Sequence, residues 1–186
     1  SKKPATQKLA EYPTLLEGKT IPDQPFLVVP QVSSERREYA PLGWLEPPVI
    51  PSDKLRFLEN ITKPEFSVLT SAIHMAWMRT VTGRMKSDYM YSVGVVYNTF
   101  PMPPIKELSK LEPYAQAILD ARAKFPEATM AELYDPDIMP AELRKAHIAN
   151  DKAVDKLYRK SGFASERERV EHLFMLYEKM TAGMLA

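Results

Sequence analysis

Proline divides this chain into two unlike halves. Of its 17 prolines, 13 lie at or before Pro104 and only 4 lie after it. Proline cannot donate a backbone hydrogen bond, and it restricts the residue before it to extended conformations. We therefore predict short, interrupted elements up to the extended Pro-Met-Pro-Pro run at residues 101–104, and longer helices beyond it. The run marks a domain boundary, which gives domains 1–104 and 105–186.

The clearest regular pattern of the first half extends from Phe66 to Thr80, where apolar residues recur at three- and four-residue steps. This spacing predicts one long amphipathic helix, with Gly83 as its expected end. A charged turn at 84–89 follows, and then the β-branched run 93–97 predicts a strand. The first domain is therefore expected to be α+β, with a small mixed sheet. Further predictions are a short helix at 7–16 and strands at Phe26–Val29, Val49–Ile50 and Leu55–Leu58.

The second half has a helical pattern almost throughout. Apolar periodicity predicts helices over 107–124 and from Pro140 to near Gly162. Thr129 is suited to cap a short helical turn, and Ser165 with Glu168 forms a capping-box pattern that opens a last helix. We therefore expect the second domain to be all-α.

The residue types present argue against catalysis within this chain. Cysteine is absent, which excludes disulfides and cysteine-bound metals, and the three histidines stand alone in the sequence. No phosphate-binding glycine loop or nucleophile motif occurs. Asp151 and Asp155 each adjoin a lysine, which favours a solvated helix face, and packing roles are favoured for His74 and His147. We expect no catalytic residue, no metal site and no cofactor in this piece.

Charge and hydropathy leave two classes of function open. The chain carries a formal net charge of +1, and no apolar run approaches the roughly 20 residues of a membrane helix. A cytoplasmic location without membrane contact is therefore expected. Arg36 and Arg37 within SSERREY indicate either a solvated loop or contacts to phosphate. The chain is either a binding module for nucleic acid or a helical module that docks a protein partner without touching DNA.

Three long segments resemble one known family. They are VVPQVSSERREYAPLGWL (28–45), LTSAIHMAWMRTVTGRMKSDYMYSVGVVYNTFPMP (69–103) and AILDARAKFPEATMAELYDPDIMPAELRKAHIANDKAVDKLY (117–158). Together they are similar to the target-recognition domain and C-terminal helical region of MmeI-like type IIL restriction–modification enzymes, which are adenine-N6 DNA methyltransferases. The Asn-Pro-Pro-aromatic methylase motif of that family does not occur here.

The resemblance implies a C-terminal piece of a longer enzyme that recognises a sequence in double-stranded DNA. The upstream methyltransferase and nuclease domains of such a parent use S-adenosylmethionine and Mg²⁺, and they are implied as intramolecular partners. Whether the chain counts as an enzyme therefore depends on those domains, because the motifs of catalysis are missing from the sequence in hand.

The resemblance also implies which side chains read DNA. It places Lys86 and Asp88 at a charged pair that sets one base pair of the target. Lysine donates to guanine O6 or N7 and aspartate accepts from cytosine N4, so the two suit one G·C pair. The alternative is an ordinary surface ion pair. Met90, where relatives often carry arginine, and Lys54 are further candidates for base recognition. The candidates for phosphate contact are Arg79, Arg84, Arg36, Arg37 and Ser87.

Overall fold

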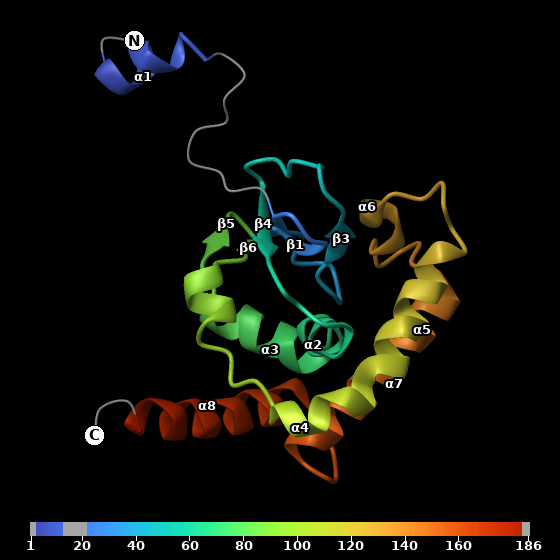
Figure 1. The fold of residues 1–186 in the computed structure, drawn as a ribbon. Coiled ribbons are helices and arrows are strands. Elements are labelled where there is room, and N and C mark those ends of the chain that lie inside the picture. Colours follow the sequence, from blue (N-terminus) through green and yellow to red (C-terminus); the bar gives the residue numbers. More distant parts are fainter. Residues whose placement is uncertain (1–2, 13–21, 184–186) are drawn as a thin grey trace.

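The structure is a computed structural model that describes residues 3–12 and 22–183. Two small antiparallel sheets and a pair of helices form the first part, and a set of longer helices forms the second (Figure 1). The predicted class, an α+β domain followed by helices, is confirmed. None of the described helices is long and apolar enough to cross a membrane.

The strands form two sheets where the sequence predicted a single mixed one. In the first sheet β1 (Phe26–Pro30) lies between β3 (Gly43–Leu45) and β4 (Leu55–Leu58). In the second, β6 lies between the other two strands, and all pairs in both sheets are antiparallel. The strands of the second sheet are β2 (Val32–Ser33), β5 (Arg84–Met85) and β6 (Asp88–Met90).

The predicted strand at Val49–Ile50 is wrong, and β3 was missed. Prolines 47, 48 and 51 enclose these two residues, so the segment lacks several of the N–H donors that a ladder requires. Trp44, whose tryptophan was expected in the core, instead marks the strand that pairs with β1. Two apolar residues between prolines are therefore a poor indication of a strand.

The long helix predicted from Phe66 is interrupted. It consists of α2 (Lys63–Leu69) and α3 (Ala72–Val81), separated at Thr70–Ser71. Thr62 and Glu65 form a capping box that fixes the start of α2. Gly83 does not end α3 in the left-handed conformation; Thr82 ends it, with φ −86° and ψ 154°.

The strand predicted at 93–97 is also wrong, because Val93–Tyr97 forms a π-helix. The N–H of Asn98 donates to the carbonyl of Val93, five residues earlier, at 2.9 Å. Ser92 accepts from the N–H of Val95, which favours a helical turn here. Both edges of β6 are already paired with β2 and β5, so the valines find no open edge of that strand.

Helices make up the second part, as predicted, and one more lies near the N-terminus. The local caps are confirmed: Thr129 forms a capping box with Glu132, and Ser165 accepts from the N–H of Glu168. Part of the helix predicted at 7–16 lies outside the described residues, and the rest overlaps α1. The helices are α1 (Pro4–Leu9), α4 (Ile105–Leu108), the 3₁₀ helix η2 (Ser109–Leu111), α5 (Glu112–Ala123), α6 (Met130–Leu133), α7 (Ala141–Tyr158) and α8 (Glu166–Ala182).

Helix α3 is the centre of the molecule. It lies between the sheets and α8, while α5 and α7 pack side by side against α2 (Figure 1). Trp77 of α3 is 1% exposed, and its ring lies 5.1 Å from that of Phe174 and 5.7 Å from that of Tyr177 on α8. The two halves therefore share one hydrophobic core.

Candidate nucleic-acid interface

The charged turn predicted after α3 is the tip of a β-hairpin. Strands β5 and β6 pair Arg84 with Tyr89 and Met85 with Asp88, which leaves Lys86 and Ser87 as a two-residue loop. Lys86 has φ 58°, and among the described residues of this loop it alone has a positive φ. A positive φ confined to the first loop residue is the pattern of a type II′ turn, whose twist matches that of the flanking strands. Hydrogen bonds of the backbone thus fix the place of Lys86.

The two faces of the hairpin differ in chemistry. Tyr89 faces the core at 7% exposure, and the Arg84 guanidinium lies 4.4 Å from the centre of its ring. Side chains alternate along a strand, so Asp88 and Met90 lie on the opposite face together with Met85, the cross-strand partner of Asp88. Met85 is 51% exposed. This outer face therefore combines charge with exposed apolar surface.

Lys86 and Asp88 do not pair with each other. Within residues 3–12 and 22–183 neither side chain forms an ion pair, so the alternative of a surface ion pair between them is not observed. The Oδ1 atom of Asp88 accepts a hydrogen bond from the Glu35 N–H at 3.3 Å. This contact orients the carboxylate and leaves acceptor positions free for a partner.

Gln31 brings the other two base-recognition candidates close together. Its N–H donates to the carbonyl of Lys54, and its own carbonyl accepts from the N–H of Tyr91, both at 2.8 Å. Met90 adjoins Tyr91 and pairs with Val32. Lys54 and Met90 therefore flank the corner where β1 passes into β2, beside the hairpin.

The phosphate candidates fall into two groups. Arg84 and Ser87 belong to the hairpin, where Arg84 donates to the Ser87 carbonyl at 3.1 Å and approaches Glu35 at 3.3 Å. Arg36 forms an exposed pair with Asp137 at 2.6 Å. Arg37 is half-buried and lines a cleft beside Trp44.

Arg79 lies in a different setting from the other arginines. Its guanidinium donates to Glu166 at 2.7 Å and to the carbonyls of Arg37 and Glu38 at 3.3 and 3.1 Å. These bonds tie the last turn of α3 to α8 and to the loop before β3. The structure thus places Arg79 at the contact between the two halves.

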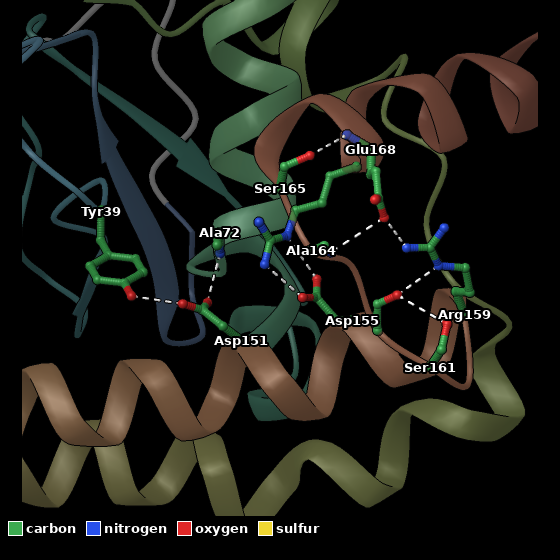
Figure 2. Close-up of polar contacts among 11 residues, drawn as sticks. Tyr39, Ala72, Asp151, Asp155, Arg159, Ser161, Ala164, Ser165 and Glu168 are labelled. Atoms are coloured by element: carbon green, nitrogen blue, oxygen red, sulfur yellow. Dashed lines mark hydrogen bonds and ion pairs between the residues drawn. The ribbon is translucent and has the colours of Figure 1, made fainter.

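Asp151 and Asp155 are buried, so their predicted solvated face is wrong (Figure 2). Asp151 accepts from the Ala72 N–H through Oδ1 and from the Tyr39 hydroxyl through Oδ2, both at 2.7 Å. Burial raises the pKa of Asp151 to about 6. Asp155 accepts two bonds from Arg169, at 3.0 and 2.7 Å. The neighbouring lysines turn to solvent, and this side of α7 faces α3 and α8.

The two central histidines are buried and hydrogen-bonded. His74 Nε2 lies 3.0 Å from the hydroxyl of Tyr91, and His147 Nε2 lies 2.7 Å from that of Tyr134. Burial lowers the pKa of each histidine to about 3, so both are neutral at pH 7. This agrees with the predicted packing roles. The described part of the chain holds no cluster of three or more potential metal ligands.

Sequence reasoning missed Met85 and the contacts of Asp151. Strand alternation from residue 84 to 90 would have grouped Met85 with Asp88 and Met90, had the turn been recognised as a hairpin. The partners of Asp151 lie 79 and 112 residues away along the chain, so no local pattern announces them.

Comparison with known proteins decides the family. Residues 1–104 match the family described as "MmeI, target recognition domain", and residues 94–185 match "MmeI, C-terminal domain". The chain belongs to the MmeI family. The resemblance found in the sequence is therefore confirmed.

Two relatives show how much of an MmeI-family protein this chain represents. It is 39% identical over 178 residues to DNA methyltransferase A of Bacillus subtilis (strain 168), which covers 95% of this chain and 20% of that protein. A solved structure of the type IIL restriction–modification enzyme MmeI in complex with DNA matches with a TM-score of 0.88 and 40% identity, over 98% of this chain and 25% of that one. The chain thus spans about a fifth to a quarter of these relatives.

Proposed function

We propose that this chain recognises a DNA sequence on behalf of a longer, bifunctional restriction–modification enzyme. The observation that carries the proposal is the exposed hairpin, which offers an unpaired Lys86 and a pre-oriented Asp88 on a fold that matches DNA-bound MmeI. A two-stranded β-ribbon fits the major groove of B-DNA, where every base pair presents a distinct pattern of donors and acceptors.

In this proposal the two charged side chains read one G·C pair. The Lys86 ammonium donates to guanine O6 or N7, and the Asp88 carboxylate accepts from cytosine N4. Met90 and Lys54 meet neighbouring positions of the site. A good contact of this kind is worth about 1–3 kcal/mol of discrimination against the wrong base.

Phosphate contacts position the protein without reading sequence. Arg84, Ser87, Arg36 and Arg37 serve this role in the proposal. Arg79 does not, because Glu166 and two carbonyls already occupy its guanidinium. The exposed pair between Arg36 and Asp137 is open to exchange for phosphate, since exposed ion pairs contribute little to stability.

The chemistry itself belongs to upstream domains in this proposal. A methyltransferase domain using S-adenosylmethionine would modify adenine N6, and a nuclease domain would use Mg²⁺ for cleavage. To be methylated, the adenine is rotated out of the duplex, while the present domain holds the DNA. We place the enzyme in the cytoplasm, where it meets DNA.

The test is a map of N6-methyladenine in DNA from cells that express the full-length enzyme with Lys86→Glu and Asp88→Arg. We expect one base pair of the methylated motif to change and the others to stay. The matched control exchanges the charges of an exposed pair on α8, Arg167→Glu with Glu171→Arg, and should leave the motif unchanged. An unchanged motif in the hairpin variant would refute the assignment of this base pair.

A second candidate function is a protein-docking module. It is favoured by an apolar groove of about 590 Å³ between the residue 101–104 run and α8, which includes Met102, Met175 and Met180. Salt separates the two functions. Binding to DNA through phosphates weakens steeply as salt rises, whereas docking to an apolar groove does not.

A further inference from the structure

Both ends of α3 are held by helices of the C-terminal domain. At its start, Asp151 of α7 accepts from the N–H of Ala72, the first residue of α3 (Figure 2). At its end, Arg79 pairs with Glu166 at the start of α8. Trp77 lies between these contacts and packs on α8.

The contact at the start of α3 replaces a missing cap. The first N–H groups of a helix have no partner within it, and the side chain of the N-cap residue usually accepts from one of them. Here the N-cap residue is Ser71, whose hydroxyl donates instead to the Val68 carbonyl at 2.6 Å. Asp151 supplies the acceptor from another domain, and the Tyr39 hydroxyl fixes its second oxygen.

The opposite end of α3 is coupled directly to the hairpin. Only Thr82 and Gly83 separate α3 from β5. The Thr82 hydroxyl donates to the Met90 carbonyl, and the Met90 N–H donates to the Gly83 carbonyl at 3.0 Å. A helix of this length spans about 15 Å, so a small tilt at Ala72 displaces the hairpin at the far end.

We propose that Asp151 is a positioning residue for sequence recognition, which caps α3 from the C-terminal domain and thereby sets the place of the hairpin against DNA. The proposal rests on the proposed function, because it assumes that the hairpin reads a base pair. It gives the C-terminal domain a part in specificity without any contact between Asp151 and DNA. A contact displaced by about 1 Å can lose most of its effect.

The test compares variants in the full-length enzyme. Duplexes are first selected by the native enzyme from a randomised library. Affinity is then measured for the selected duplex and for one in which the base pair assigned to Lys86 and Asp88 is replaced. The ratio of the two affinities reports on sequence discrimination, whereas affinity for the replaced duplex reports on the phosphate contacts alone.

Asp151→Ala removes the cap, and we expect the ratio to fall about tenfold with little change for the replaced duplex. Asp151→Asn should restore the ratio to within about twofold, because its oxygen still accepts from Ala72 and its amide can donate to the Tyr39 oxygen. The control is Glu142→Gln, which neutralises an exposed acid on the same helix and should leave the ratio unchanged.

A second variant approaches the same bond from its donor. Proline is well tolerated at the first position of a helix, so Ala72→Pro deletes the N–H while keeping helical backbone angles. Ser71, with φ −90° and ψ 162°, already has the extended conformation that a following proline requires. If Asp151→Ala fails to fold, Ala72→Pro decides the question, and we expect it to lower the ratio as well.

The outcomes separate this proposal from the one on which it rests. A native enzyme that binds both duplexes equally would refute the reading role of the hairpin. A native enzyme that discriminates, with folded Asp151→Ala or Ala72→Pro variants that discriminate equally well, would refute positioning alone. Equal losses of affinity for both duplexes would show that Asp151 serves only the stability of the fold.

Discussion

The two ends of α3 use polar side chains in opposite ways. Beyond the C-terminal end, at the hairpin, Lys86 is exposed and unpaired within the described residues, and Asp88 has a single backbone donor. At the N-terminal end, Asp151 and Asp155 are withdrawn from water and bonded through both oxygens. At the hairpin the backbone is fixed while the side chains stay available. At the start of α3 the side chains themselves do the fixing.

This difference shows how a recognition surface and its support divide the work. Buried polar groups that are fully bonded specify one arrangement, and unbonded ones would be costly. Exposed polar groups contribute little to stability and remain free to meet a partner. Substitutions should therefore affect stability on the α3–α8 side and recognition on the hairpin side. The following tests run from the largest expected effect to the smallest.

Trp77→Ala should damage the support most. Trp77 is almost fully buried against Phe174 and Tyr177, and removing such a side chain typically costs about 3–5 kcal/mol of unfolding free energy. Denaturant unfolding measures the loss. Trp44→Ala is the matched control, and we expect a smaller loss because Trp44 is only half-buried. Equal losses would contradict the central place given to α3.

Arg169→Met should rank second. It leaves the Asp155 carboxylate, whose side chain is 7% exposed, without its two donors. Loss of one partner from a buried pair predicts a decrease of about 3 kcal/mol in the free energy of unfolding. Arg167→Met on the same helix removes an exposed guanidinium and should change stability by less than about 0.5 kcal/mol. Similar effects at both positions would show that burial does not distinguish them.

The pH dependence of stability sharpens the comparison. The pKa of Asp151 is raised by burial from 3.8 to about 6, so the folded state holds the proton more tightly than the unfolded chain. Relative to Asp151→Asn, the free energy of unfolding should rise as the pH falls from 7 to 4, by on the order of 2 kcal/mol. Urea unfolding across this range, at constant ionic strength, measures the difference.

Other groups titrate in the same range with the opposite sign. His74 and His147 have lowered pKa values, so each loses stability as the pH falls below 6.5. Because both proteins carry these histidines, their effect cancels in the difference. Tyr39, Asp155 and Arg169 surround Asp151 and are also common to both. A difference that stays flat from pH 7 to 4 would contradict the raised pKa.

Met85→Ala should have the smallest effect on stability and a measurable one on binding. Met85 is half-exposed, so we expect less than about 0.5 kcal/mol of change in unfolding. It lies across from Asp88 on the outer face, where an apolar side chain suits contact with a thymine methyl group. We expect affinity for the selected duplex to fall, as measured by fluorescence anisotropy. Ile138→Ala, at another exposed apolar residue, should leave affinity unchanged.

Features set by neighbours in sequence were predicted best. The caps at Thr129 and Ser165 depend on residues three positions away, and both were found. The strand over Phe26–Val29 was found as well, because β1 is buried and flanked by proline. The class of fold followed from such local patterns, together with the distribution of proline.

Features set by distant partners were not predicted. Asp151 resembles a solvated residue because Lys152 follows it, and only its bonds with Ala72 and Tyr39 give it another role. The valines at 93–96 favour a strand intrinsically, yet a strand also requires a free edge to pair with. Lys86 and Asp88 were named through resemblance to a family; their local sequence alone does not distinguish them from any charged turn.

The positive φ of Lys86 has a consequence for how specificity can diverge in this family. Glycine, asparagine and aspartate adopt such a backbone easily, whereas β-branched residues do so at a penalty. The set of side chains that selection can test at this position is therefore narrower than the set that DNA would accept. Asp88 lies in a regular strand and carries no such restriction. Descendants should thus vary more freely at position 88, and a new partner for the base pair at position 86 would have to come from the residues that this turn admits.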